Sequence, residues 1–332
     1  MPSADAAPVA TQPVAQAIGS MGLPIDMVAA EAATKALAHS HYENFSVISF
    51  LLPRHLRQDF CNVYSYCRTA DDAADEVPDQ NQSLRLLADL REELHETYAG
   101  RPKRPIFIAL SATIQRHSIP VEPFDDLLDA FEQDRRINRY QTFDEVVAYC
   151  RRSADPVGRL VLWMCGYRDQ TRQRLSDRTC TALQLANFWQ DVRRDLLERD
   201  RIYLPAESMD RFGVSETSLR QQIAQHRCDE SFRHLIRFEV DRTAGLFDEG
   251  EALLPMLDRS VRGQIGLFGS GGRAVLKSIR DQNYDTLTQR PSLSKWQKGH
   301  LIATALLSRL TAAACLTSPS RRQTQSTAGV QG

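Results

Sequence analysis

Apolar residues recur every three or four positions over most of the chain, from about residue 25 to about residue 315. This spacing is typical of amphipathic helices, whereas the alternating pattern of strands is scarce. Two local signals mark helix starts: Thr142 is followed three residues later by Glu145, as in a capping box, and Ser83 stands before an amphipathic run. The pattern predicts helices at residues 24–39, 53–77, 82–98, 105–116, 121–136, 142–151, 155–168, 173–199, 215–226, 229–257, 259–282 and 292–314.

The chain shows no internal repeat at a fixed period and no obvious linker. Long helices without heptad regularity favour a stack of helices around a central cavity or groove. We therefore expect an all-α fold with one helical domain at residues 23–315. The Ala-, Pro- and Gln-rich residues 1–22 and the polar residues 316–332 are predicted to be disordered. A division into two domains, with a separate module beyond about residue 215, is the alternative.

Charge and cysteine content narrow the class of protein. The 332 residues contain 41 Lys and Arg and 42 Asp and Glu, and this balance argues against a general affinity for nucleic acid. The seven cysteines are odd in number and include no Cys-x-x-Cys, which argues against a disulfide framework or a zinc site. The N-terminus has no signal-peptide pattern, and the apolar residues 301–316 are too short to span a bilayer comfortably. We expect a cytoplasmic protein, soluble or peripheral to the inner face of the membrane.

Residues 60–77, FCNVYSYCRTADDAADEV, carry acidic residues where a helix should be apolar. One stripe of this helix begins with aromatic and apolar side chains and ends in two carboxylates. Two like charges one turn apart are costly to bury unless a cation neutralises them. The stripe predicts a metal site, and its members are Phe60, Tyr64, Cys67, Asp71 and Asp75.

The neighbouring acids Asp72 and Glu76 lie about 100° further round the helix and are predicted to face solvent. Arg68 lies one turn before Asp72 and close to Asp71, so it is a candidate partner for both. The alternative for the whole segment is an ordinary solvated acidic cluster at a helix end.

A second acidic stripe lies in residues 183–205, LQLANFWQDVRRDLLERDRIYLP. Gln184, Asn187, Asp191 and Asp195 are spaced by three, four and four residues, so they share one helix face. Two such Asp-x-x-x-Asp pairs on separate helices could supply the oxygen ligands that Mg²⁺ prefers. Bound Mg²⁺ would stabilise the negative charge of a departing diphosphate.

The alternative for this second stripe rests on Arg193 and Arg194, which lie between Asp191 and Asp195 in the sequence. If these two arginines paired with the aspartates, the acidic stripe would need no metal.

Four segments resemble squalene, phytoene and dehydrosqualene synthases. HYENFSVISFLLPRHLRQDFCNVYSYCRTADDAADE resembles the family's opening, and NFWQDVRRDLLERDRIYLP resembles its second aspartate motif with the following R-I-Y-L-P signature. The family's Tyr-Cys segment between these two is resembled by RYQTFDEVVAYCRRSADPVGRLVL. A later family segment is resembled by RDQNYDTLTQRPSLSKWQK. The resemblance covers about residues 38–300. It implies an isoprenoid-synthase-type helical domain around a central cavity and an isoprenoid diphosphate substrate.

The resemblance also implies roles for individual residues at the polar end of the cavity. Ligands of Mg²⁺ would be Asp71, Asp75, Asn187, Asp191 and Asp195. Contacts to phosphate would come from Arg68 and Arg290, with Gln184 lining the same end. Residues near the ionisation site would be Tyr149 and Asp134.

Other implied roles concern the hydrocarbon end and the carbocation. Phe45 and Val157 would border the hydrocarbon chains, and Gly158 would permit a helix kink. Aromatic rings that could stabilise a carbocation are Tyr42, Phe45, Tyr64 and Phe188. Asn44 is a polar candidate for placing a water molecule.

Several positions depart from the family pattern. A Ser-containing motif is replaced at residues 42–45, and the family's Val-Ala-Gly-Thr-Val-Gly reads SADPVG at residues 153–158. Gln190 replaces an Arg that would contact phosphate, Glu43 adds negative charge, and Gly272 replaces an aromatic residue. These departures resemble the hydroxysqualene synthases of bacterial hopanoid pathways. Members of that branch ionise presqualene diphosphate, rearrange the cation and capture it with water.

The favoured activity is therefore Mg²⁺-dependent conversion of presqualene diphosphate to hydroxysqualene, without NADPH. The absence of a G-x-G-x-x-G motif agrees weakly with this. Expected partners are a presqualene diphosphate synthase, a hydroxysqualene oxidoreductase and the membrane that receives an apolar product. One alternative is a head-to-head prenyl transferase that condenses two farnesyl or geranylgeranyl diphosphates. Another is a non-catalytic homologue that acts as an assembly factor.

Overall fold

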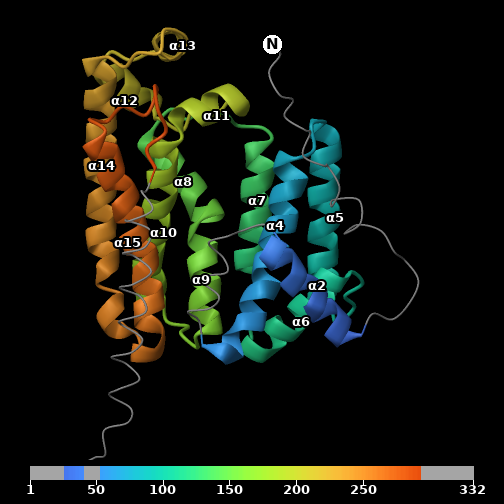
Figure 1. Cartoon of the computed structure of the whole chain (residues 1–332). Helices are drawn as coiled ribbons and strands as arrows, with labels where there is room; N and C mark the ends of the chain where they lie inside the picture. The colour runs from blue at the N-terminus through green and yellow to red at the C-terminus, as the bar shows by residue number, and fades with distance from the viewer. Residues whose placement is uncertain (1–25, 41–52, 293–332) are drawn as a thin grey trace, which may run out of the picture.

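The computed structural model describes residues 26–40 and 53–292, and in this part of the chain it confirms the all-α fold (Figure 1). The described residues contain no strand, and the single backbone bridge between Arg139 and Ile202 is isolated. Two 3₁₀ turns, η1 (Arg54–Leu56) and η2 (Leu254–Met256), accompany the α-helices. The α-helices are α2 (Met27–Ser40), α4 (Arg57–Asp75), α5 (Gln80–Tyr98), α6 (Pro105–His117), α7 (Glu122–Asp134), α8 (Phe143–Ser153), α9 (Asp155–Met164), α10 (Gln170–Gln190), α11 (Val192–Glu198), α12 (Ala206–Arg211), α13 (Glu216–Ala224), α14 (Glu230–Glu251) and α15 (Arg259–Asp281).

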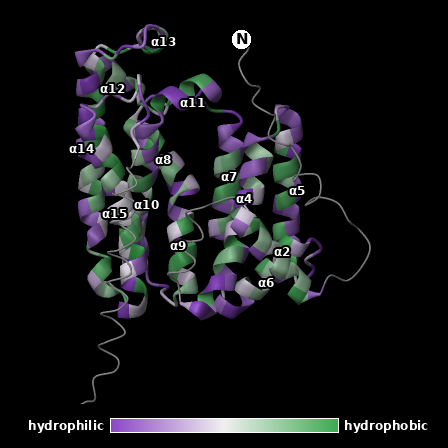
Figure 2. Cartoon of the chain, in the orientation of Figure 1, coloured by the Kyte–Doolittle hydropathy of each residue, from purple (hydrophilic) through white to green (hydrophobic). Residues whose placement is uncertain are grey.

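The helices form two groups with α8 and α9 between them. Helices α2, α4, α5, α6 and α7 lie on one side in Figure 1, and α10, α14 and α15 lie on the other. The short helix α11 crosses the upper end of the bundle. In Figure 2, hydrophobic and hydrophilic residues alternate around each long helix, as expected where one face is buried.

Two hydrophobic clusters fill the bundle. One surrounds Tyr66 and draws on α4, α5, α6 and α7, and α9 adds Leu160 to it. The other surrounds Trp189, whose indole N–H donates to Thr243 Oγ1 at 2.8 Å, and draws on α8, α10, α14 and α15. Because α9 also packs against α10, it connects the two clusters. Residues before and after position 215 therefore share one core.

Helix starts agree with the sequence in part. The Thr142 side chain accepts a hydrogen bond from the N–H of Glu145 at 3.2 Å. The Glu145 carboxylate, however, accepts from the N–H of Gln141 and not from that of Thr142. The predicted start at Ser83 is wrong, because Asp79 caps α5 by accepting the N–H of Gln82. Ser83 lies one turn inside the helix, where its buried hydroxyl donates to the Ala73 carbonyl at 2.8 Å.

The predicted long helix at residues 173–199 is divided. Its backbone bends at Asp191 (φ −106°, ψ 14°), which ends α10 and starts α11. Residues 206–211 form α12, which periodicity did not predict because the helix is too short to show it. The predicted helix at residues 229–257 ends at Glu251 and is followed by the turn η2, which contains Pro255. The predictions for residues 1–22, 292–314 and 316–332 lie mostly or wholly outside the described residues.

The expected helix kink at Gly158 is also wrong. The chain breaks at Ala154 (φ −122°, ψ −48°), between α8 and α9, and Gly158 lies inside α9. A Cβ atom at Gly158 would overlap Ser176 Oγ and Cys180 Sγ of α10. The glycine therefore serves close packing of α9 on α10.

No helix of the described part is long and apolar enough to cross a membrane.

Asp155 is a buried carboxyl group between α9 and α10. Burial, with repulsion from Asp177, raises its pKa to about 7, and Thr181 Oγ1 donates to it at 2.8 Å. Because this pKa exceeds the unfolded value of about 4, the stabilising contribution is present below pH 4 and is lost as the pH rises toward 7.

We expect Asp155→Asn to raise the free energy of unfolding by about 1–2 kcal/mol above pH 7, since a neutral amide avoids the cost of burying a charge. Below pH 4 the variant and the parent should be equally stable. Urea denaturation between pH 4 and pH 8 measures this difference. A shift of the same size at every pH would contradict a proton-linked origin.

Candidate active site

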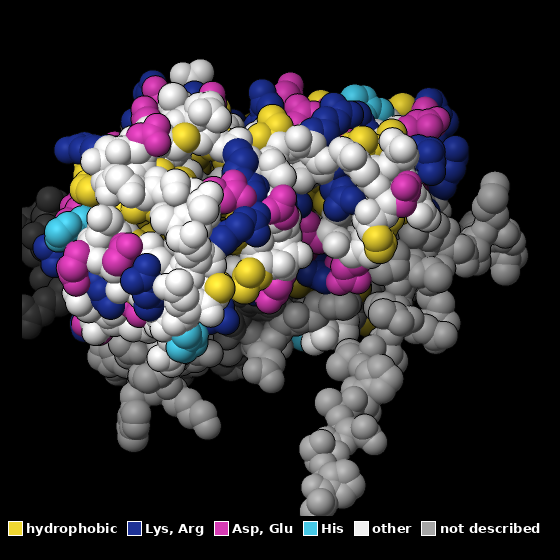
Figure 3. Space-filling view, turned by 90° about the horizontal axis from the view of Figure 1, so that it is seen from above, with side chains coloured by type: hydrophobic (Ala, Val, Ile, Leu, Met, Phe, Trp, Pro, Cys, Tyr) yellow, Lys and Arg dark blue, Asp and Glu magenta, His cyan; other side chains and the backbone are white. Residues whose placement is uncertain are grey.

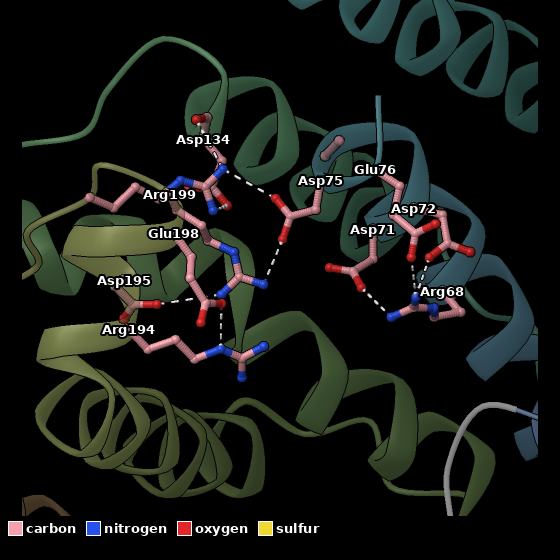
Figure 4. A network of polar contacts seen from close by, with 12 residues as sticks. Arg68, Asp71, Asp72, Asp75, Glu76, Asp134, Arg194, Asp195, Glu198 and Arg199 are labelled. Atoms are coloured by element: carbon pink, nitrogen blue, oxygen red, sulfur yellow. Dashed lines mark hydrogen bonds and ion pairs between the residues drawn. The ribbon is translucent and has the colours of Figure 1, made fainter. Parts of the chain in front are cut away.

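The two acidic stripes meet at one end of the bundle. Asp71 and Asp75 occupy the last turns of α4, Asp191 lies at the bend before α11, and Asp195 lies on α11. Acidic and basic side chains gather in the middle of this face when it is seen from above (Figure 3). The close view shows Asp75 of α4 directed toward Arg199 at the end of α11, whereas Asp71 and Asp72 contact Arg68 of their own helix (Figure 4). The sequence placed each pair on one helix, and the structure brings the helices together.

One arginine connects the two stripes. The Nη2 atom of Arg199 lies 3.3 Å from Asp75 Oδ2, and its Nη1 atom lies 3.4 Å from Asp195 Oδ1. In fact each of the four motif aspartates is paired with at least one arginine. The pairs are Asp71 with Arg68 (2.9 Å), Asp75 with Arg199 and with Arg201 (3.2 Å), Asp191 with Arg290 (Nη2 to Oδ2, 2.8 Å) and Asp195 with Arg199.

The arginines that were expected to compete with a metal point elsewhere. Arg193 donates to the backbone carbonyls of Leu287 and Thr288, at 3.3 and 3.1 Å. Arg194 pairs with Glu198 at 2.9 Å, one turn along α11. The alternative in which these two neutralise the second stripe is therefore wrong.

The arginine pairs do not fully compensate the carboxylates. Burial, with repulsion from Asp191, raises the pKa of Asp195 to about 7 even though Arg199 opposes this rise. Burial and the charge of Asp75 raise the pKa of Asp71 in the same way, against Arg68 and Arg199. A raised carboxyl pKa means that the site favours further positive charge.

An all-oxygen set with surplus negative charge fits Mg²⁺ better than a soft metal. As the side chains lie, however, no group of three or more His, Cys, Asp or Glu among residues 26–40 and 53–292 is arranged to hold a metal ion. The carboxylates would have to approach one another first.

The predicted exposure of Asp72 is wrong. Its side chain is only 14% exposed and lies 2.5 Å from Arg68 Nη2, whereas Glu76 is 51% exposed, as expected. Arg68 contacts both of these residues as well as Asp71, so it draws together two carboxylates of α4 and that of Glu76, which caps the end of the helix. Asp72 is held at the edge of the site by this shared guanidinium.

A buried aromatic layer lies beneath the carboxylates. Tyr149 donates its hydroxyl to Asp134 Oδ2 at 2.8 Å, and burial raises the pKa of Asp134 to about 6 despite Arg201 and Tyr149. The rings of Phe188 and Tyr203 stack with centroids 3.6 Å apart, and Tyr149 packs against both. Tyr149, Asp134 and Phe188 thus lie close together.

Sequence reasoning missed Arg199, Arg201 and Tyr203. Arg201 is almost buried, and its Nη2 atom donates both to Asp75 and to the Asp134 backbone carbonyl, each at 3.2 Å. The signal was present, because Arg201 and Tyr203 belong to the R-I-Y-L-P segment. That segment was matched to the family without a role for its individual side chains.

An apolar cavity of about 210 Å³ lies lower in the bundle, between α9, α10, α14 and α15. Val157 and Gly158 line it, together with Leu183 and Phe247. Leu183 precedes Asp191 by eight residues, so the cavity lies about 12 Å along α10 from the carboxylates. The placement of Val157 agrees with a hydrocarbon-lining role.

Of the remaining predicted residues, some lie in the described part of the chain and some do not. Gln184 is half-buried and Asn187 is exposed on α10, and Tyr64 is half-buried on α4 against Ala38 and Cys61. Asn187 also accepts the N–H of Asp191 with its backbone carbonyl, at 2.9 Å. The positions not placed are Tyr42, Glu43, Asn44 and Phe45, which lie outside the described residues.

Two of the departures, Gln190 and Gly272, each have a structural counterpart. Gln190 is buried, donates to the Pro291 carbonyl at 2.6 Å and accepts from Arg290 at 3.2 Å. A guanidinium thus reaches Asp191 from Arg290 instead of from position 190. At Gly272, a Cβ atom would overlap Phe247 and Leu183, which occupy the space beside this glycine.

Comparisons with known proteins agree with this geometry. The phytoene synthase of Mycobacterium tuberculosis is 31% identical over 278 residues, covering 84% of this chain and 91% of that protein. The crystal structure of the squalene synthase HpnC from Alicyclobacillus acidocaldarius is 42% identical, with a TM-score of 0.73, and covers 79% of this chain and 97% of that one. The hydroxysqualene synthase of Zymomonas mobilis is 35% identical over 182 residues, covering 53% of this chain and 59% of that protein.

The sequence model of squalene/phytoene synthase matches residues 38–297, which include both aspartate motifs. The chain therefore belongs to the squalene/phytoene synthase family of all-helical prenyl transferases that act on isoprenoid diphosphates.

Proposed function

We propose that this protein converts presqualene diphosphate to hydroxysqualene and diphosphate, on the route to squalene and hopanoids. The observation that carries the proposal is the convergence of two incompletely neutralised aspartate pairs above an apolar cavity. The choice of branch rests on the 42% identity to the squalene synthase HpnC and on the similarity to a hydroxysqualene synthase.

In this reaction the C–O bond to the diphosphate breaks, and the leaving group takes the electron pair. Mg²⁺ held by Asp71, Asp75, Asp191 and Asp195, with Asn187 beside them, would supply stabilisation of the charge on that leaving group. Arg68 pairs with Asp71, and Arg290 pairs with Asp191. From these positions both arginines can donate to phosphate oxygens.

The carbocation has to rearrange before water captures it, so the protein must limit the access of water. The buried rings of Tyr149, Phe188 and Tyr203 are packed together beside the carboxylates and can face a cation. Asp134 fixes the Tyr149 hydroxyl by accepting its proton in a hydrogen bond. We assign Tyr149 the role of a wall of the ionisation site.

The second candidate is a head-to-head prenyl transferase that condenses two prenyl diphosphates. It is favoured by the many phytoene synthases among the relatives, such as the one from Mycobacterium tuberculosis. A non-catalytic assembly factor is disfavoured, because a scaffold gains nothing from carboxyl groups whose pKa is raised by burial and by mutual repulsion.

The proposal includes the setting of the enzyme. It would work in the cytoplasm, with its apolar product passing to the membrane and no nicotinamide cofactor bound. A synthase of presqualene diphosphate would supply the substrate and an oxidoreductase would consume the alcohol.

Product analysis tests the proposed function directly. Purified enzyme with Mg²⁺ and presqualene diphosphate, but no nicotinamide cofactor, should release a C30 alcohol. In H₂¹⁸O the alcohol should carry the label, because solvent water adds its oxygen to the cation and loses a proton. Mass spectrometry detects the alcohol and its label, and Asp71→Asn is the matched inactive control.

Two results would count against this assignment. Rapid consumption of farnesyl diphosphate to presqualene diphosphate, squalene or phytoene would favour the head-to-head alternative. An alcohol without the label would rule out capture by solvent water.

A further inference from the structure

Arg199 occupies the position between the two aspartate motifs. It is the C-terminal cap of α11, and its side chain, 36% exposed, lies between Asp75 of α4 and Asp195 of α11 (Figure 4). It therefore bridges the two helices that carry the candidate metal ligands. The guanidinium of Arg199 therefore lies where the proposed function requires Mg²⁺.

The two arginines beside Asp75 are held very differently. Arg201 is 9% exposed, and a backbone carbonyl of Asp134 fixes its guanidinium in addition to the carboxylate. Within the part of the chain that the structure describes, the contacts of Arg199 are one nitrogen to each of two carboxylates, at 3.3 and 3.4 Å. Asp195 is only 10% exposed, but the guanidinium of Arg199 is partly exposed, so water can replace its two single, long contacts when it moves away. Of the two arginines, Arg199 therefore leaves at the lower cost.

The position of Arg199 also explains the spacing of the acids. While its guanidinium lies between Asp75 and Asp195, these carboxylates cannot close around a common ion, and the described acids form no metal-binding group as they stand. A divalent cation would satisfy both carboxylates better than one shared guanidinium.

We propose that Arg199 is an exchangeable counter-ion of the active site, which gives up Asp75 and Asp195 to a divalent cation and then binds the diphosphate. This inference rests on the proposed function, since it concerns the same site. It predicts opposite effects on two ligands: Arg199 competes with the cation but assists the anion. A residue with a purely structural role would not affect the two affinities in opposite directions.

Isothermal titration calorimetry of Arg199→Gln tests this inference without relying on turnover. With MgCl₂ alone, EDTA-treated and dialysed variant should bind about tenfold more tightly than the parent, because no guanidinium competes for the carboxylates. With inorganic diphosphate at saturating Mg²⁺, the variant should bind about tenfold more weakly. Arg199→Lys keeps the charge but not the fork of donors, so its Mg²⁺ affinity should remain close to that of the parent.

The matched control is Arg194→Gln. Arg194 lies on the same short helix and pairs with the exposed Glu198, not with a motif aspartate, so both affinities should be unchanged. Circular dichroism shows whether each variant is folded, and Arg199→Ala, which also removes the guanidinium, provides the same comparison if the Gln variant is not.

The outcomes separate this inference from the proposed function. Equal or weaker Mg²⁺ binding by Arg199→Gln would overturn the counter-ion role and leave the metal site standing. Unchanged diphosphate affinity would overturn the second half of the role. If the parent itself bound Mg²⁺ no better than an Asp71→Asn variant, both the metal site and the inference would fail.

Discussion

Asp71→Asn and Asp191→Asn are each expected to lower turnover by at least 100-fold, equivalent to about 2.7 kcal/mol of barrier. Each change removes one negative charge from the four carboxylates that converge beside α11, while keeping the size of the side chain. The fold should survive, because the arginine partners Arg68 and Arg290 are not fully buried and can be hydrated. Steady-state kinetics with presqualene diphosphate measures the loss, and circular dichroism verifies the helical content.

Glu76→Gln is the control for this prediction. Glu76 lies just after α4 and shares Arg68 with Asp71, but it is largely exposed and belongs to neither motif. Its turnover should remain near that of the parent. If both aspartate variants kept more than about a tenth of parental turnover, the carboxylates would not be metal ligands. EDTA should inactivate the parent, and added Mg²⁺ should restore it.

Gly250→Ala is expected to lower the free energy of unfolding by about 3 kcal/mol, toward the upper end for overpacking. A Cβ atom at this position of α14 would overlap Thr179 Oγ1 and approach two backbone atoms of α10, Thr179 N at 3.0 Å and the Leu175 carbonyl oxygen at 3.2 Å. Backbone atoms cannot move aside as a side chain can, so the helices have to separate. Urea denaturation measures the effect.

Gly245→Ala on the same helix is the matched control. Nothing lies within 4 Å of a Cβ atom placed there, so alanine should stabilise the protein by about 0.5–1 kcal/mol through its higher helix propensity. A similar response at both positions would show that α14 does not depend on the close approach to α10. Since α10 leads directly into Asp191, some loss of activity in Gly250→Ala should accompany the loss of stability.

The acidic stripes show which features the local sequence predicts. Asp71 and Asp75 share a helix face because they are four residues apart, and the same holds for Asp191 and Asp195. That relation depends only on the geometry of one helix, so periodicity alone predicts it. The all-α fold was predictable on the same ground, because apolar spacing is read within each helix.

The cations that face Asp75, Asp191 and Asp195 were not predictable in this way, whereas Arg68, one turn from Asp71 on the same helix, was. Arg193 and Arg194 are the nearest arginines in sequence, yet the contacts come from Arg199, Arg201 and Arg290. Two of these follow the end of α11, where the backbone at Asp200 adopts a positive φ of 51° and turns back toward α4. The third arrives from a segment that Gln190 and Arg193 hold against α10 and α11.

By itself, therefore, the sequence determined the helices, the two carboxylate pairs and the family motifs, because each depends on residues within a few turns of one another. The tertiary structure alone decided which cations face Asp75, Asp191 and Asp195, and that glycines serve close contacts between α9, α10 and α14. The physical reason is that ion pairs and glycine contacts depend on how separate helices pack, and a local pattern does not encode their distance or rotation.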